Sequence, residues 1–328
     1  MSENNINDWV FVPEEENEYI VDMSNCGYVA KLVGNTLELL PAQGATAPII
    51  VAPSRTTAPI GVDHELYAKF CASRRAKIKR VVFGDGICGI GKYEFIDDRY
   101  KNLTSIHLGA DMEFDATSFF GMYGLSEITC SEDNLQYQVI DNVLYSRDLK
   151  TLIRYTPGKP EAFFSVPDHV ERLEHYAFMD ANKLQCVKVG KNVKSIGNQC
   201  FDNCHDLRHI YIGEGVESIE GEYIFALSDY DGRIYLTREG LVIGGKAQSA
   251  AERWCAEINK LCGEYREELV CDFFDEITFS RIEDDEIDKF LTLPLPDLRD
   301  DKYLAKYFDT KDEIERNIPR LPNNDLPF

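Results

Sequence analysis

The chain has 328 residues, with 57 acidic and 35 basic side chains and a formal net charge of -22. This excess of negative charge repels polyphosphates and anionic lipid headgroups, which argues against nucleic acid or a membrane surface as the partner. Hydrophobic residues make up 44% of the chain and charged residues 28%, an ordinary balance for a protein with a packed core.

The N-terminus has no basic or apolar run, and no later stretch approaches the roughly 20 apolar residues that span a bilayer. We therefore expect a cytoplasmic chain without membrane insertion. The alternative is a cell-surface or secreted protein whose signal is missing from this sequence. The ten cysteines are scattered and form no Cys-x-x-Cys pair, so we expect free buried thiols.

Residues 1–76 do not follow the pattern of the later chain and predict an N-terminal cap with short strands. A hairpin with a primed turn is expected around Gly34-Asn35, because two alternating segments flank this turn sequence. Strands are predicted at residues 9–12, 19–21, 28–33 and 36–40, a loop at 42–59 and a short helix at 63–76.

Residues 77–245 repeat an apolar segment of the form L-x-x-I-x-I every 22 to 25 residues between uninterrupted neighbours. This period is typical of solenoids, whose units bury their apolar faces only by stacking on each other. A turn with glycine follows four of the segments, at Gly84, Gly109, Gly190 and Gly213, and an apolar pair and an aromatic anchor come next. The segments begin at Ile78, Leu103, Leu125, Leu184 and Leu207, and the anchors are Phe95, Phe119, Phe178, Phe201 and Phe225.

Two insertions are expected in the array. Residues 134–159 predict a meander of three strands at residues 137–140, 143–145 and 151–155. A weaker version is predicted at residues 231–243, as two short strands around a charged turn.

Residues 246–328 predict a helical cap followed by an acidic tail. Ala250, Trp254, Ile258, Leu261 and Leu269 fall near helical spacing, which predicts an amphipathic helix that closes the far end of the solenoid. The chain beyond Phe273 is acidic and contains proline, with a last helix predicted near residues 300–317.

The sequence from Val193 to Leu207 resembles the V-x-x-I-G-x-x-A-F-x-x-C-x-x-L unit of BspA-like leucine-rich repeats. The sequence from Tyr137 to Lys159, followed by Val166-Pro-Asp-His-Val170, is similar to the inserted hairpin of that family. The resemblance covers about residues 77–245. It implies a mainly β, curved leucine-rich repeat solenoid with one strand per repeat, in proteins often found at bacterial surfaces and regarded as adhesins or interaction modules.

Three patterns could carry chemistry, and we assign none of them to a site. The G-x-G-x-x-G pattern of dinucleotide-binding sites occurs once, from Gly84 to Gly89. Its glycines align with the turn glycines of other repeats, so we interpret them as turn residues. Cys200, Cys204, His205 and His209 could bind zinc, but the repeat directs both cysteines into the core. The acidic run at residues 283–286 lacks the glycine of a calcium loop and predicts a solvated face. We therefore expect no catalytic residues, no metal and no cofactor.

The repeated strand predicts a binding surface, because alternate side chains point away from the core. Mixed polar, histidine and aromatic side chains on a rigid sheet favour a protein or peptide ligand. One predicted row holds Val82, His107, Thr129, Ser165, Lys188 and Tyr211, and a second holds Arg80, Ser105, Glu127, Cys186 and His209.

These observations predict a non-enzymatic module that binds a protein or peptide ligand on its strand face. Three alternatives stay open. The chain could be an exported adhesin-like protein, an enzyme that uses its atypical terminal regions, or a solenoid that associates with itself.

Overall fold

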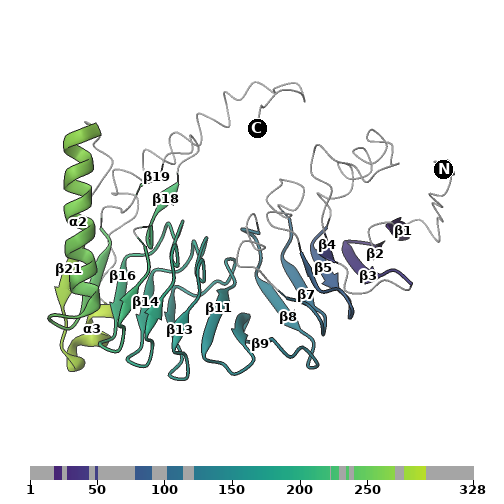
Figure 1. The fold of residues 1–328 in the computed structure, drawn as a ribbon, viewed down its shortest axis with the longest axis horizontal. Coiled ribbons are helices and arrows are strands. Elements are labelled where there is room, and N and C mark those ends of the chain that lie inside the picture. The colour runs from purple at the N-terminus through teal and green to yellow at the C-terminus, as the bar shows by residue number, and fades with distance from the viewer. Residues whose placement is uncertain are drawn as a thin grey trace, which may run out of the picture.

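The computed structural model describes residues 18–23, 28–43, 49–50, 78–90, 102–113, 122–221, 223–228, 234–235, 240–269 and 277–292. Short strands follow one another along a single long axis, with β1 (Glu18–Met23) at one end and α2 (Ala250–Leu269) at the other (Figure 1). This one-dimensional arrangement is the solenoid that the 22- to 25-residue period predicts.

The N-terminal sheet has the order β1-β2-β3-β5-β7-β8. Its first three strands are antiparallel, and Gly34-Asn35 joins β2 to β3 with Leu32 opposite Leu37 and φ of +61° at Gly34, as the hairpin prediction required. From β3 onward the pairs are parallel, so the N-terminal hairpin extends the repeat sheet. The remaining strands of this sheet are β2 (Tyr28–Val33), β3 (Thr36–Pro41), β5 (Arg80–Phe83), β7 (Ser105–Leu108) and β8 (Glu127–Cys130).

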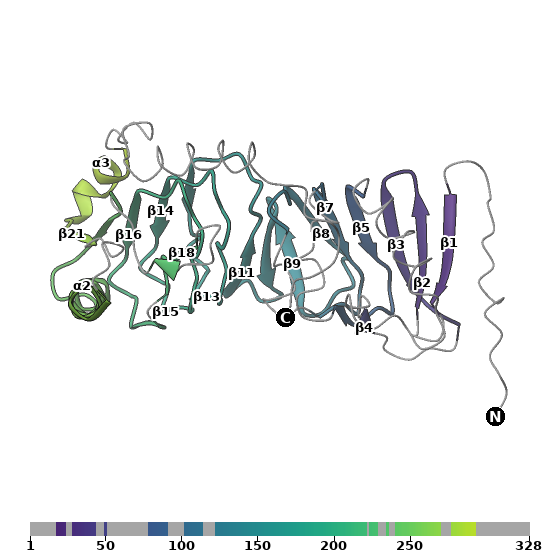
Figure 2. The same cartoon turned by 90° about the horizontal axis from the view of Figure 1, so that it is seen from above.

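The second half of the array has two sheets, which lie on opposite sides in Figure 2. The C-terminal sheet is parallel throughout and places Val187 beside Ile210 and Ile210 beside Ile243. Its strands are β12 (Phe163–Ser165), β14 (Cys186–Val189), β16 (His209–Ile212), β20 (Val242–Gly245) and β21 (Thr278–Arg281).

The opposite sheet contains a second, two-residue strand from each of three repeats: β13 (Arg172–Leu173), β15 (Ser195–Ile196) and β17 (Ser218–Ile219). The sequence analysis expected one strand per repeat. Two-residue strands are too short to show an alternating pattern, so only their pairing identifies them.

The predicted meander at residues 134–159 is confirmed as an antiparallel sequence of three strands that joins the opposite sheet. Asp141 and Asn142 connect the first two strands with φ of +50° and +58°, the left-handed values that a tight primed turn requires. The strands are β9 (Tyr137–Ile140), β10 (Val143–Ser146) and β11 (Thr151–Tyr155).

The predicted hairpin within residues 231–243 is wrong in its pairing. β19 (Ile234–Tyr235) pairs with β18 (Leu227–Ser228), whereas β20 continues the parallel ladder beside β16. A repeat strand and a hairpin strand share the same alternation, so the sequence alone does not separate them. A further short pair joins β4 (Ile49–Ile50) to β6 (Gly89–Ile90).

A column of aromatic rings forms the centre of the C-terminal half. Tyr155, Phe178, Phe201 and Phe225 stack in sequence, with ring centroids 5.3, 4.8 and 5.4 Å apart and interplanar angles of 25°, 17° and 14°. The anchor prediction is therefore confirmed for Phe178, Phe201 and Phe225. The predicted anchors Phe95 and Phe119, the strand at 9–12 and the helices at 63–76 and 300–317 lie outside the described residues.

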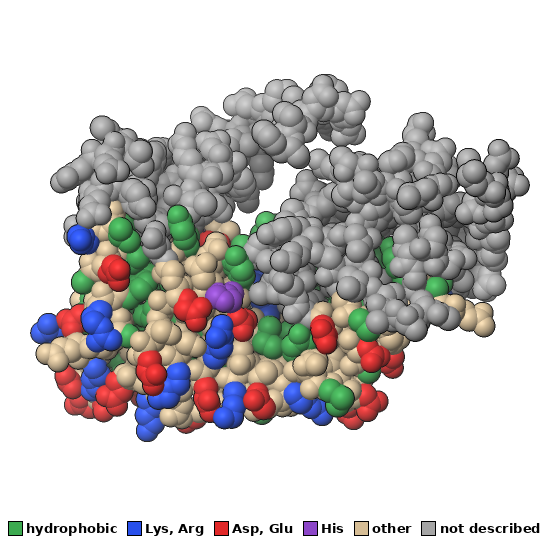
Figure 3. All heavy atoms as spheres, in the orientation of Figure 1, with side chains coloured by type: hydrophobic (Ala, Val, Ile, Leu, Met, Phe, Trp, Pro, Cys, Tyr) green, Lys and Arg blue, Asp and Glu red, His purple; other side chains and the backbone are tan. Residues whose placement is uncertain are grey.

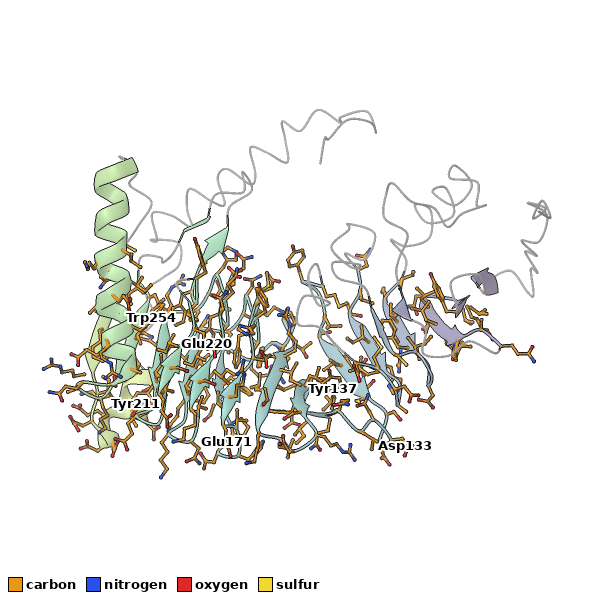
Figure 4. The ribbon with its side chains drawn as sticks, in the orientation of Figure 1. Asp133, Tyr137, Glu171, Tyr211, Glu220 and Trp254 are labelled. Atoms are coloured by element: carbon orange, nitrogen blue, oxygen red, sulfur yellow. The ribbon has the colours of Figure 1, made fainter. Side chains whose placement is uncertain are left out.

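The predicted amphipathic helix is α2, and it covers the last aromatic ring of the column. Trp254 meets Phe225 at 5.5 Å and 70°, and its indole N–H donates to the carbonyl oxygen of Gly221. Ile258 is also buried, on the same side of the helix. Trp254 lies at the array end that α2 closes (Figure 4).

The turn glycines permit the close stacking of the repeats. A Cβ atom at Gly109 would lie 2.6 Å from the carbonyl oxygen of Gly84, and one at Gly213 would lie 2.8 Å from that of Gly190. Any larger residue at Gly109 or Gly213 would push neighbouring turns apart.

The ladder continues beyond Gly245 into the segment that the sequence analysis assigned to the acidic tail. β21 pairs in parallel with β20, placing Thr278 opposite Val242 and Phe279 opposite Ile243. A short 3-10 helix, η5 (Asp284–Glu286), and α3 (Ile287–Leu291) follow. This part of the predicted tail is therefore folded against the repeats.

Candidate binding surface on the strand face

The outward side chains of the N-terminal and C-terminal sheets form the surface that we call the strand face. The strand register aligns Arg80, Ser105 and Glu127, and next to them Val82, His107 and Thr129. In the C-terminal sheet it aligns Ser165, Lys188 and Tyr211, and next to them Phe163, Cys186 and His209. The predicted rows are therefore aligned within each sheet, but they divide between two sheets because the 134–159 meander intervenes.

The N-terminal part of the strand face is open. Arg80 and Glu127 are exposed, Val82, His107 and Thr129 are half-buried, and Ser105 is buried. These residues present a cation, a carboxylate and polar groups on three adjacent strands. Whether they hold a ligand stays a prediction.

His107 is oriented by its neighbour on β8. Its Nδ1 lies 2.9 Å from Oγ1 of Thr129, and the Thr129 hydroxyl lies 3.3 Å from the carbonyl oxygen of Ile106, to which it can donate. Because the Thr129 hydroxyl donates its proton to Ile106, it can only accept from His107, so Nδ1 carries the ring proton and donates to Oγ1. In this neutral tautomer Nε2 is unprotonated and is the acceptor. Burial and the Arg80 guanidinium lower the pKa of His107, so the ring is neutral at pH 7 and offers that acceptor to a partner.

The first strand of the C-terminal sheet adds an exposed apolar residue. The Phe163 side chain is 48% exposed on β12, and Ser165 on the same strand is also exposed. An aromatic ring next to polar positions is a common anchor in protein interfaces. The predicted first row included Ser165 of this strand, but the second row omitted Phe163, which the register aligns with Cys186 and His209.

The other end of the strand face is covered by the chain itself. Residues 282–291, which we call the covering segment, place Ile282, Phe290 and Leu291 against Cys186 and Tyr211. Helix α3 contacts β14 and β16 and lies beside them in Figure 2. The sequence analysis predicted Tyr211 and His209 as ligand-facing residues, but they are 4% and 6% exposed. Their side chains do point outward, and the covering segment occupies the surface they form.

Two lysines hold the acidic side of the covering segment. Lys246 Nζ lies 3.0 Å from Glu283 Oε2 and 2.9 Å from Asp284 Oδ1, and these carboxylates raise the pKa of Lys246. Lys188 Nζ lies 3.6 Å from Asp288 Oδ1. Lys188, a predicted ligand-binding residue, thus pairs with a carboxylate of the chain's own C-terminal segment.

Gly244 gives Phe290 room to approach the backbone of β20. A Cβ atom at Gly244 would lie 2.8 Å from Cε1 of Phe290 and 3.0 Å from Cγ1 of Ile282. Such distances are too short for carbon atoms, so only glycine allows this contact. The sequence analysis interpreted Gly244-Gly245 as the end of the repeats, and their role in docking became visible only with the covering segment in place.

A buried charged cluster that the sequence did not predict lies inside the same repeats. Arg154, Asp180 and Asp202 are 1%, 3% and 7% exposed. Burial raises the pKa of Asp180 to about 6 against the opposing effect of Arg154, and burial together with Asp180 raises the pKa of Asp202 to about 7. These carboxyl groups lie away from the strand face and bear on stability, because their ionisation inside the core is unfavourable.

The other candidate sites have geometries that the repeat explains. Gly84 and Gly86 form a repeat turn in which Asp111 accepts from the Gly86 N–H, and β6 follows instead of a helix. Cys200 and Cys204 are buried, which raises the pKa of both thiols well above the usual value. Within the described ranges, no group of three or more His, Cys, Asp or Glu side chains is placed to hold a metal ion. In the same part of the chain, no helix has the length and apolar character needed to cross a membrane.

The stacked repeats and their ladder of parallel strands define the class as a leucine-rich repeat solenoid. Residues 161–247 match the BspA type leucine rich repeat region in six copies. This part of the chain is therefore a BspA-type leucine-rich repeat region, as the sequence resemblance predicted. A search of curated proteins found no match.

Several solved bacterial structures are similar to the chain. A leucine rich cell surface protein from Faecalibacterium prausnitzii shares 17% identity, with 86% of this chain and 100% of that chain covered and a TM-score of 0.33. A leucine-rich repeat protein from Bacteroides ovatus shares 16% identity, with coverage of 74% and 62% and a TM-score of 0.30. One from Eubacterium ventriosum shares 15% identity, with coverage of 58% and 73% and a TM-score of 0.28.

Proposed function

We propose that this protein is a non-enzymatic interaction module that holds a protein or peptide partner on its strand face. One observation carries the proposal: the C-terminal part of this face already holds a peptide segment, residues 282–291, through apolar contacts and lysine–carboxylate pairs. A surface that accepts a segment of its own chain has the shape and chemistry to accept one from a partner.

The open part of the strand face is the proposed contact surface. Arg80 and Glu127 supply opposite charges two strands apart, and His107 supplies an oriented acceptor between them. Phe163 and Ser165 extend this surface at β12. Acidic and basic side chains are interspersed on the other side of the molecule as well, which Figure 3 shows, and that side therefore offers a matched control surface.

A pair of charge-swapped variants tests the proposal. Arg80→Glu with Glu127→Lys reverses two charges on the open strand face and leaves the net charge unchanged. Lys150→Glu with Glu171→Lys does the same at the edge of the opposite sheet, directly before β11 and β13, where the two side chains form an exposed ion pair with Nζ 2.9 Å from Oε1. Each purified chain is used to capture partners from the native extract, and captured proteins are quantified by mass spectrometry.

We expect the intact chain and the Lys150/Glu171 variant to capture the same partner. The Arg80/Glu127 variant should not capture it. A partner retained equally by all three chains would place its site outside the open strand face. Circular dichroism checks that both variants stay folded.

The cellular location is part of the same proposal. Cys88, Cys130, Cys186, Cys200, Cys204 and Cys255 are thiols outside any disulfide and are buried or half-buried, as expected in a reducing compartment. This favours the cytoplasm over the cell surface. Fractionation of native cells with an antibody to the chain separates the two locations.

A further inference from the structure

The covered part of the strand face has features that the repeat core does not require. Cys186 and Tyr211 form an apolar cluster with the covering segment, and this cluster is separate from the main core. The corresponding outward positions of the open part hold one apolar residue, Val82, and five polar ones: Arg80, Ser105, His107, Glu127 and Thr129. The apolar platform is thus confined to the strands that carry the covering segment.

The platform fits an occupant of definite chemistry. Gly244 leaves room over β20 for an aromatic ring, and the ring of His209 meets that aromatic ring from the side. Lys188 and Lys246 flank the platform and pair with carboxylates. The matching occupant is a short amphipathic segment with an aromatic anchor and acidic residues.

The covering segment satisfies these requirements with few contacts. Its buried side chains are Ile282, Phe290 and Leu291, while residues 283–286 are exposed and acidic. Helix α3 has five residues, too few to be stable without the surface beneath it. A partner that offers the same side chains on a longer helix would displace it by mass action.

We propose that the covering segment is an internal competitor, and that the platform of Cys186, His209, Tyr211 and Gly244 is a second binding site for an acidic amphipathic segment of a partner protein. This inference deepens the proposed function and rests on it, since it names the partner chemistry and the regulation of the covered part of the strand face. A partner binds at full strength only when residues 282–291 leave the platform.

A labelled peptide tests the inference without a known partner. The probe is a fluorescent synthetic peptide with the sequence of residues 282–292, and its control is a scrambled peptide of the same composition. Binding is measured by fluorescence anisotropy to the intact chain and to the full chain carrying Phe290→Ala and Leu291→Ala. A second variant, Glu283→Lys with Asp284→Lys, releases the segment by changing exposed residues alone and replaces the first if that one does not fold.

The expected result is binding of the probe to either released chain at least tenfold tighter than to the intact chain, with no binding of the scrambled peptide. Adding Lys188→Glu and Lys246→Glu to either released chain should abolish binding of the probe. Equal binding of the probe to the intact and released chains, or no binding to a folded released chain, would overturn the inference. A released chain that dimerises in sedimentation but ignores the probe would overturn it too, because the occupant would then be a second copy.

The two proposals fail separately in these experiments. The capture experiment changes Arg80 and Glu127, neither of which contacts the platform, and the peptide experiment leaves both unchanged. Loss of capture by the Arg80/Glu127 variant together with no peptide binding would sustain the proposed function and reject this inference.

Discussion

The ring of His209 meets the ring of Phe290 edge to face, with centroids 5.2 Å apart and an interplanar angle of 81°. His209 belongs to a repeat strand, and Phe290 belongs to the short helix at the end of the described chain. Their contact joins the predicted binding surface to the segment that covers it. The strand face of this leucine-rich repeat protein therefore has an open part and an occupied part.

Substitution at Gly244 should release the covering segment. A Cβ atom in Gly244→Ala would meet the Phe290 ring at 2.8 Å, so we expect faster backbone hydrogen exchange at residues 287–292, while β14 and β16 stay protected. Gly190→Ala is the matched control, because the nearest atoms to its added Cβ lie at 3.8 Å. Unchanged exchange in Gly244→Ala would show that the contact does not depend on this glycine.

The contact between α3 and β16 should weaken in acid. Burial and the neighbouring Arg208 lower the pKa of His209, and its buried Nδ1 has no hydrogen-bond partner in the described part of the chain. A lowered histidine pKa means that its contribution to stability is present above about pH 6.5 and is lost as the pH falls through the folded-state value.

Hydrogen exchange at residues 287–292, compared at pH 7 and pH 5 after correction for intrinsic rates, measures this effect. His209→Phe keeps an aromatic ring but removes the titration, so it should reduce the difference between the two pH values. Carboxylates of the covering segment and the Lys188–Asp288 pair are common to both chains and cancel in the comparison. An equal pH response in the two chains would exclude His209 as its source.

The buried acids should give stability the opposite pH dependence. The pKa values of Asp180 and Asp202, about 6 and about 7, lie above the usual carboxyl value, so their contribution is fully present below about pH 4 and is lost as the pH rises through 6 to 7. Asp180→Asn with Asp202→Asn removes both titrations. Relative to the unmodified chain, the free energy of unfolding of this variant should rise by on the order of 4 kcal/mol between pH 5 and pH 8, because the two carboxyl groups together account for about three pKa units over that range.

Urea unfolding at several pH values measures that difference. If the difference in free energy of unfolding between the two chains stayed constant from pH 5 to pH 8, this result would contradict the raised pKa values of Asp180 and Asp202.

Removal of one ring from the aromatic column should destabilise the whole C-terminal half. Phe201 is 1% exposed and stacks between Phe178 and Phe225, so Phe201→Ala is expected to cost about 3–5 kcal/mol in the free energy of unfolding. Phe163→Ala is the matched control, because this ring is half-exposed on the strand face and should cost less than about 1 kcal/mol. If the two substitutions lowered the free energy of unfolding by similar amounts, the aromatic column would not be a main source of stability for the stacked repeats.

The parts of the fold that follow from local chemistry could be predicted from the sequence. The turns at Gly34-Asn35 and Asp141-Asn142 join adjacent strands, so residues near in sequence determine them. Phe178, Phe201 and Phe225 of the aromatic column could also be predicted, because they recur in successive repeats, whereas Tyr155 comes from the inserted meander and was not predicted to join them. The amphipathic pattern that begins at Ala250 was enough to predict α2.

The contacts of the covering segment could not be predicted in the same way. Its acidic composition is that of a solvated tail, and its partners Cys186, Tyr211 and Gly244 are far away in sequence. The same limit explains why His209 and Tyr211 were predicted to face a ligand. Burial of Arg154 beside Asp180 likewise depends on stacking between repeats, which the alternating pattern of a single strand does not show.

Carboxyl footprinting of the captured partner complex tests the central claim, that the strand face is the binding surface, most directly. Glu127 lies on the open strand face, Glu171 directly precedes β13 of the opposite sheet, and both are exposed, so a carbodiimide label reaches both in the free chain. The account predicts that the partner reduces labelling of Glu127 several-fold and leaves labelling of Glu171 unchanged. Protection of Glu171 with full labelling of Glu127 would contradict it.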